Sequence, residues 1–461
     1  MTRGAGIGAL VIDAEGGVGW WSPQVPAVAS VSLELGPGVL IEVDIAWPQT
    51  VLVWTVASDA SPAPLAAAFD DSAFGDLIDQ LRAGGESVST FEGRMLSDVW
   101  ARRALVAAVS RWTLYPIDGG ALMLDTAVAE NGIGNSGAAA QLMRFAEYAL
   151  IDLAGDAGRE LSTAAAGSVL EALAVAGSLG VLADSTELTA ALAERSTIDD
   201  ESLLAALTSW RTAAADQFVG VIDQAGGSPE TDAEYGVLDI AAVPARIVAW
   251  NGAREPELRL AQTEDGFVIS TALAAGADPL CKEAGELLAY LSDSETGKLV
   301  AVTPATVDRD SIVAQFPALD VELFQLRFGL FDANIDPHDL RLDRVGVALI
   351  DVDRLMLEAW NNDREAVVAL HTVGPDSSAD ALERARAGYE ARLTVAQTAT
   401  NNAQSILDRL IARQESGEPV RGLLVKRRGA IARYRAYLAD PARGYADPIL
   451  AEVIPPVDAW Q

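Results

Sequence analysis

Eight short apolar runs follow one another between residues 236 and 331: GVLDI (236–240), RIVAW (246–250), ELRLA (257–261), FVISTAL (267–273), ELLAYL (286–291), KLVAVT (298–303), SIVAQF (311–316) and QLRFGLF (325–331). Turn residues separate the runs, among them Asn251-Gly252 and Asp265-Gly266. Short alternating runs at this spacing are typical of antiparallel strands in two packed sheets. This stretch therefore predicts a central Ig-like antiparallel β-sandwich over residues 234–340.

The segments before this stretch have two different patterns. Residues 1–60 contain the alternation of strands, as at Val31 and Leu33, and predict an N-terminal β unit that either stands alone or completes a sheet elsewhere. Residues 61–224 have helical periodicity with alanine on most faces, which predicts an alanine-rich helical bundle. Residues 225–233 (AGGSPETDA) have the composition of a linker.

The segments after the central stretch are helical. Residues 341–440 predict a helical hairpin, with one helix over residues 345–372 and a second that reaches residue 415. The second helix carries a heptad repeat at Leu382, Tyr389, Ala396, Ala403 and Leu410. This seam favours packing against the neighbouring helix of the same chain, and a homo-oligomer formed through residues 379–410 is the alternative. With a proline-rich tail at 441–461, the predicted fold class is an α+β multidomain protein.

The composition is that of an acidic globular protein. Of the 461 residues 50% are apolar, which argues against a disordered chain. Asp and Glu number 66 against 33 Lys and Arg, so the formal net charge is −33. Such a surface repels nucleic-acid phosphates and anionic membranes, which argues against both as partners of the body of the molecule. Abundant alanine and a preference for arginine over lysine indicate a bacterial source.

The cysteine content and the hydropathy pattern predict a cytoplasmic protein. Cys281 is the only cysteine, so no internal disulfide is expected, and with only two histidines a structural zinc site is not predicted. The first ten residues lack the basic and apolar regions of a signal peptide. Residues 164–183 are long enough to cross a membrane, but Glu171 near their middle favours a buried bundle helix, so no membrane span is predicted.

Several motifs that resemble catalytic or ligand-binding sites are better explained as turns and helices of the fold. GIGNSG at 132–137 has the GxGxxG pattern of dinucleotide sites, but a helix is predicted before it, so an interhelical turn is expected. Asp351 and Asp353 would hold magnesium at the end of a strand, whereas on the predicted helix their side chains point apart. His338, His371 and Cys281 lack neighbouring partners for nucleophilic catalysis, and spacing selects no carboxylate pair. No catalytic, cofactor-binding or metal-binding residue is therefore predicted.

A basic cluster in the last predicted helix is the strongest candidate for a binding site. Its members are Arg421, Lys426, Arg427, Arg428, Arg433 and Arg435, with no acidic residue among them. In so acidic a chain, this helix is expected to contact a protein surface, of its own body or of a partner, in preference to nucleic acid or a membrane. The tail adds apolar residues, Ile454 and Trp460 among them, which pack either on the chain's own core or in a partner's groove.

The function predicted from the sequence is a non-catalytic scaffold or adaptor subunit of a bacterial cytoplasmic assembly, with other proteins as partners. Protein contacts are expected through the β-sandwich, the basic helix and the tail. One alternative is a hydrolase that works with carboxylates alone, with or without magnesium. The other alternative is nucleic-acid binding through residues 421–435.

Overall fold

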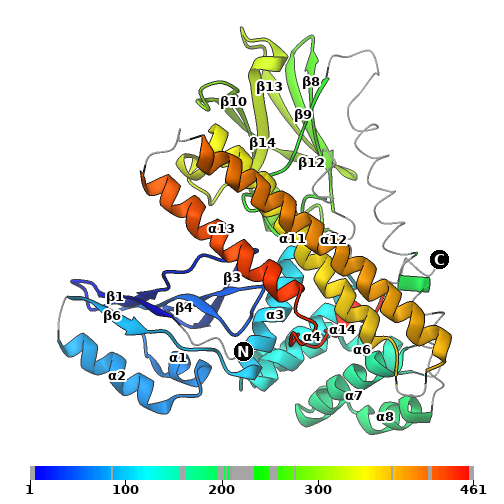
Figure 1. Cartoon of the computed structure of the whole chain (residues 1–461). Helices are drawn as coiled ribbons and strands as arrows, with labels where there is room; N and C mark the ends of the chain where they lie inside the picture. Colours follow the sequence, from blue (N-terminus) through cyan, green and yellow to red (C-terminus); the bar gives the residue numbers. More distant parts are fainter. Residues whose placement is uncertain are drawn as a thin grey trace.

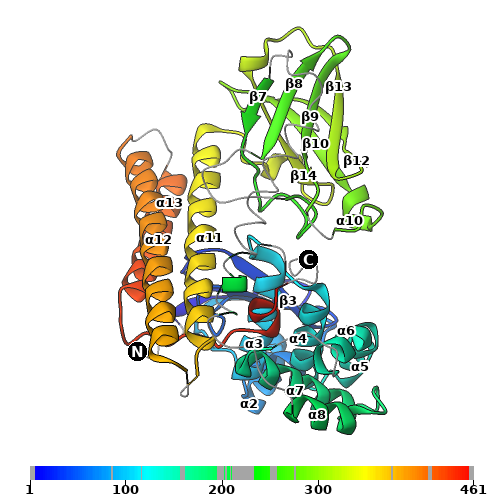
Figure 2. The ribbon, with the colours of Figure 1, turned by 90° about the vertical axis from the view of Figure 1, so that its right-hand side faces the viewer.

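The computed structural model describes residues 6–84, 87–115, 117–155, 161–194, 202, 205–207, 209, 233–249, 257–274, 277–374, 377–413 and 418–455. The architecture is a mixture of helices with three antiparallel sheets, which confirms the coarse prediction of both element types. Three long helices near the C-terminus run alongside an N-terminal sheet with its helices and alongside a β-rich lobe (Figure 1, Figure 2).

The N-terminal sheet has six strands in the order β3-β4-β5-β2-β1-β6. They are β1 (Ile7–Ile12), β2 (Val18–Trp21), β3 (Ser30–Gly36), β4 (Val39–Asp44), β5 (Val51–Val56) and β6 (Ser87–Glu92). Two helices, α1 (Ala63–Ala68) and α2 (Ser72–Ala83), follow β5. Trp20 and Trp54 are buried on the inner face of the sheet, where Phe74 of α2 meets Trp54 edge to face.

Strand β6 lies in a segment that the sequence predicts to be helical, so that part of the prediction is wrong. Helical periodicity predicts no strand between residues 61 and 224, yet residues 87–92 pair with β1 and complete the N-terminal sheet. The β unit predicted for residues 1–60 is therefore completed by a segment that lies outside it. Every side chain of β6 except that of Phe91 is exposed, so the strand lacks the alternation that marks a half-buried strand.

Helices fill the next part of the chain: α3 (Asp98–Trp112), α4 (Gly119–Gly132), α5 (Ser136–Phe145), α6 (Glu147–Ala154), α7 (Thr163–Ser178) and α8 (Ser185–Glu194). The side chains of Asp118, Asn135 and Ser162 accept hydrogen bonds from first-turn amides, which is why α4, α5 and α7 begin there. Ala146 ends α5 and precedes α6.

Two predictions for this region have different outcomes. Helix α7 occupies most of the membrane-like stretch, and among the described helices none has the length and apolar character needed to cross a bilayer. The end of the predicted helical bundle, from residue 195 to 224, and the linker predicted over 225–233 lie almost entirely outside the described residues.

The β-rich lobe forms two antiparallel sheets in the orders β12-β13-β9-β8-β7 and β11-β10-β14. Its elements are β7 (Ala233–Gly236), β8 (Leu258–Thr263), β9 (Gly266–Ala272), α10 (Lys282–Gly285), β10 (Leu287–Asp293), β11 (Leu299–Pro304), β12 (Thr306–Asp308), β13 (Ser311–Pro317) and β14 (Leu326–Asp332). Strand β11 contacts β13 and β14 contacts β7, so the sheets touch. Of the predicted runs, 236–240 meets a strand only at Gly236, and 246–250 contributes one bridge, Val248 to Leu273.

The Ig-like topology is not confirmed. In the immunoglobulin order the second and third strands lie in different sheets, whereas β8 and β9 form a hairpin in one sheet. Only Glu264 and Asp265 separate these two strands, and Gly266 adopts a φ of +144° that L side chains avoid. A turn this short keeps both strands in one sheet. The periodicity of the sequence does not show whether two successive strands lie in the same sheet or in different sheets.

Long helices form the C-terminal part: α11 (Arg344–His371), α12 (Ala379–Ala412) and α13 (Glu418–Leu438). Asp343 and Ser378 cap the first turns of α11 and α12. Helix α12 packs on both α11 and α13 and buries Ala396, Ala403 and Leu407. Ala396 and Ala403 of the heptad thus pack within the chain, whereas Leu382 is exposed. Self-association through residues 379–410 stays a prediction.

Candidate interaction surface on the C-terminal helix and tail

Helix α13 buries an apolar side. Leu424, Ile431, Tyr434 and Leu438 recur at helical spacing and are all buried. The ring of Tyr434 meets that of Trp47, just after β4, edge to face with 5.9 Å between centroids. The helix is therefore held between α12 and the N-terminal sheet.

Arg427 lies on the same buried side, three residues after Leu424. Its guanidinium donates hydrogen bonds to the carbonyls of Pro26 and Val28 and, at 2.7 Å, to Asp353 Oδ1. A buried cation is stable only when it is paired in this way. Arg427, which the sequence placed among the partner-binding residues, is therefore committed to contacts within the chain.

The other five bases of the cluster are exposed. They are Arg421, Lys426, Arg428, Arg433 and Arg435. Helical spacing divides them into one row at 421, 428 and 435 and another row at 426 and 433. Arg428 Nε lies 2.6 Å from Asp408 Oδ1, so the first row borders α12. The rows are separated by small residues, namely Gly422, Val425, Gly429, Ala432 and Ala436.

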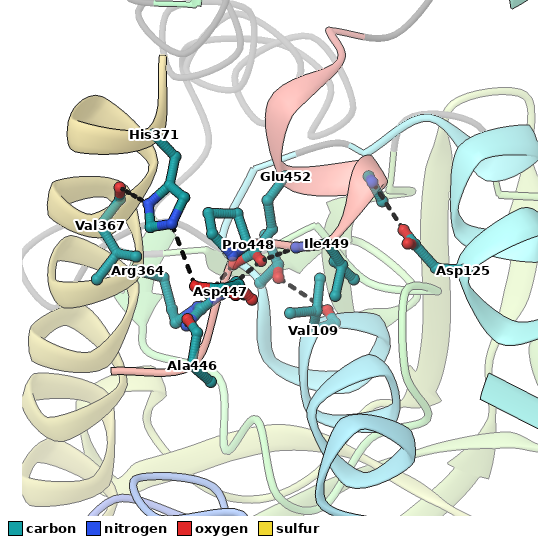
Figure 3. A network of polar contacts seen from close by, with 12 residues as sticks. Val109, Asp125, Arg364, Val367, His371, Ala446, Asp447, Pro448, Ile449 and Glu452 are labelled. Atoms are coloured by element: carbon teal, nitrogen blue, oxygen red, sulfur yellow. Dashed lines mark hydrogen bonds and ion pairs between the residues drawn. The ribbon is translucent and has the colours of Figure 1, made fainter. Parts of the chain in front are cut away.

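The tail returns to the body of the same chain (Figure 3). Its apolar side chains at Ile449, Leu450, Val453 and Ile454 are buried, in or beside the short helix α14 (Leu450–Val453). Ile454, which the sequence offered as a partner contact, therefore packs within the chain. Trp460 lies outside the described residues.

Polar contacts from three helices hold the tail in place. Glu452 pairs with Arg364 of α11 through two hydrogen bonds of 2.8 and 2.7 Å. Asp125 of α4 accepts the N–H groups of Leu450 and Ala451 at 2.9 and 2.8 Å (Figure 3). Arg102 of α3 donates to the carbonyl of Asp447 at 2.9 Å, and His371 Nε2 lies 3.2 Å from Asp447 Oδ1.

The environment of Asp125 makes stability depend on pH. Burial raises the pKa of its carboxyl from 3.8 to about 7, although the N–H groups of Ala451 and Leu450 act in the opposite direction. Between these two values the native state holds a proton that the unfolded state has lost. By linkage, this contribution to stability falls as the pH rises through the window and is constant above it.

We expect Asp125→Asn to remove this part of the pH dependence. The stability advantage of the unmodified chain over the variant should shrink by up to about 4 kcal/mol between pH values of about 4 and 7. Urea unfolding of both proteins at a series of pH values measures this difference. Parallel pH profiles of the two proteins would contradict the assignment.

The GIGNSG segment forms the turn between α4 and α5, as predicted. Gly134 in this turn has a φ of +87°. The turn lines a cavity of about 210 Å³ together with β3 and α3. On its polar wall, Arg103 Nε donates to Glu130 Oε1 at 2.6 Å, and Asn135 Nδ2 donates to Glu130 Oε2 at 2.8 Å. Since α4 precedes the turn, the strand that a dinucleotide site requires is not there.

The remaining candidate residues are dispersed. Asp351 and Asp353 lie on the continuous helix α11, and Asp353 pairs with Arg341 and with Arg427. Cys281 is half-buried before α10, and His338 is exposed in a single 3₁₀ turn. Within the described part of the chain, no three His, Cys, Asp or Glu side chains are grouped closely enough to hold a metal ion.

The described contacts thus divide the predicted site residues. Arg427 and Ile454 stabilise the fold, while the other five bases of α13 are exposed, although Arg428 and Arg435 also contact Asp408 and Asn401 of α12. The sequence reasoning missed Asp125, Arg364 and Glu452. Comparison with protein-family models, with curated proteins and with solved structures finds no match for this chain.

Proposed function

We propose that the chain is a non-catalytic scaffold or adaptor subunit that binds another protein through the outer face of α13. The observation that supports this most is the pair of basic rows on either side of small residues on one exposed helix face. This positive surface stands on a chain of net charge −33. A positively charged surface on a negatively charged protein steers and orients a partner that carries negative charge.

The partner that this face fits is an acidic helix. Small side chains between the rows let a second helix approach closely. The rows then supply guanidinium and ammonium donors for carboxylates on both sides of that helix. Nucleic acid gains nothing from the small residues, and its dense negative charge is repelled more strongly by the acidic body of the protein.

The proposal retains the modular layout, with the β-rich lobe as a second contact surface. Val300 and Val302 are exposed on β11, which is an edge strand of the three-stranded sheet. The proposed place of action is the bacterial cytoplasm, which the acidic composition and single cysteine support.

Reversing charge on α13 is expected to release the partner. The double variant Arg421→Glu, Lys426→Glu changes two exposed side chains, so the fold should tolerate it. Retention of the partner should fall at least about tenfold, because attractive pairs become repulsive. The measurement is quantitative mass spectrometry of proteins that co-purify with the tagged full chain from its native host.

Arg409→Glu, Arg413→Glu is the matched control. It makes the same change in charge at exposed positions of α12 and just after it. Proteins lost from the α13 variant and kept by the control support the proposal. Nucleic acid lost in the same pattern would replace it with the nucleic-acid alternative. If both variants keep everything that the unmodified chain retains, the proposal is wrong.

A further inference from the structure

Strand β6 leaves the backbone of the N-terminal sheet open on one side. In an antiparallel ladder, successive residues turn their N–H and C=O groups alternately to the two sides of the strand. The N–H of Gly93 donates to the carbonyl of Gly6 at 2.9 Å. The register continues without a shift, so residues 91, 89 and 87 bond to β1. Val88 and Thr90 therefore turn their backbone groups outward.

In the part of the chain that the structure describes, this edge lacks the usual protection against further pairing. Natural sheets block an open edge with proline, lysine, a bulge or a covering element. Strand β6 contains no proline or lysine and has no bulge against β1. Within the described residues β1 is its only neighbouring strand, and β6 lies at the margin of the sheet (Figure 1). Arg94 donates to the carbonyl of Glu92 at 3.4 Å, at the end of the strand, and also lies beside the ring of Phe91.

The same end of the sheet exposes apolar side chains. Ile7 is 67% exposed and Val88 is 76% exposed, both on the outer face. Trp21 of β2 lies on this face above Gly19, where any side chain would collide with the indole ring. An antiparallel sheet normally turns polar side chains to solvent, so this face has the character of a contact surface.

The charge around β6 limits what binds there. Residues 1–92 contain 12 Asp and Glu but only two Arg and no Lys. Asp13 and Glu15 are exposed in the turn beside one end of β6, and Glu92 is exposed at the other end. A second copy of this chain would bring the same negative charge to the edge. A basic segment would be attracted to it.

We propose that β6 binds an extended, basic segment of another protein by β-strand addition. Its main chain pairs with Val88 and Thr90. Residues whose N–H groups face β6 place their side chains on the outer face, where apolar and β-branched side chains pack on Val88 and Ile7. Flanking lysines or arginines meet the acidic side chains at both ends. This contact does not depend on α13.

A synthetic peptide tests the proposal directly. The probe is the fluorescein-labelled peptide KTVTVTVK, and its binding to the full chain is followed by fluorescence anisotropy at low and high salt. We expect binding that weakens as salt is added. N-methylation of the valines should weaken binding about tenfold or more, because it removes the N–H groups that face β6. N-methylation of the threonines should have little effect.

A protein variant provides the second measurement. Thr90→Pro removes an outward N–H group and leaves the ladder with β1 intact. We expect about tenfold weaker peptide binding at an unchanged melting temperature. Thr90→Val, which keeps the N–H group, should bind as the unmodified chain does. The α13 variant should also keep peptide binding, which separates this test from that of the proposed function.

Three outcomes would overturn the inference. They are no peptide binding at low salt, equal effects of the two N-methylated peptides, and full binding by a folded Thr90→Pro variant. If Thr90→Pro does not fold, the two peptides decide the question with the unmodified chain.

Discussion

Replacing Glu257 with glutamine is expected to lower the free energy of unfolding by about 3–5 kcal/mol. The side chains of Glu257 and Arg354 are 0% and 1% exposed, and they form a direct ion pair. Glu257 Oε2 also accepts the N–H of Leu238 at 3.1 Å. Glutamine keeps the shape but not the charge, so the buried Arg354 loses the carboxylate that pairs with it where the β-rich lobe meets α11.

Urea unfolding followed by circular dichroism measures this change. Asp408→Asn is the matched control, because Asp408 pairs with Arg428 while both side chains are about half exposed. Solvent screening limits the expected loss in the control to less than about 1 kcal/mol. Equal stability of the Glu257→Gln variant and this control would show that burial does not set the strength of the pair.

Replacing Glu452 with glutamine is expected to cost a similar amount, about 3–5 kcal/mol, and to release the tail. The side chains of Arg364 and Glu452 are both almost completely buried. Glu452 Oε2 also accepts the N–H of Ile449 at 2.9 Å, at the start of α14. The variant removes the negative charge that pairs with Arg364 and offers one acceptor oxygen in place of two.

Limited digestion with trypsin reports the release of the tail. Arg443 is buried, and its guanidinium lies 2.5 Å from Asp363, so cleavage after it requires the tail to leave. Because proteolysis follows the population of the open form, cleavage should rise at least about a hundredfold. The control is Asp447→Asn, which changes an exposed carboxylate beside His371. Trypsin should cleave this variant at the same rate as the unmodified chain. Equal rates for all three proteins would contradict the role of Glu452.

Elements with a regular buried face were predictable from the sequence. Residues 345–372 were predicted as one helix, and α11 spans Arg344–His371. Most strands of the β-rich lobe coincide with the apolar runs, because one side of each strand is buried and periodicity records that. Strand β6 was missed because almost all of its side chains are exposed. Strand order was missed because it depends on turn geometry, which periodicity does not report.

The candidate surface was predictable only in part. The basic cluster on α13 is real, but Arg427 differs from its neighbours because it follows Leu424 by three residues and precedes Ile431 by four. That spacing places it on the buried side, and it was a signal in the sequence. Arg364 and Glu452 lie 88 residues apart, so no local pattern joins them. Long-range ion pairs of this kind follow from the fold alone.

The contacts of the tail can form only at the end of protein synthesis. Arg102, Asp125 and Arg364 all leave the ribosome before the segment that contacts them, residues 447–452. Until that segment emerges, Arg364 lacks its carboxylate and Asp125 lacks its two N–H donors. A chain whose translation stops before residue 449 cannot form these contacts, and we expect cellular proteases to degrade it faster than the full chain. The tail thus links the stability of a newly made chain to the synthesis of residues 447–452.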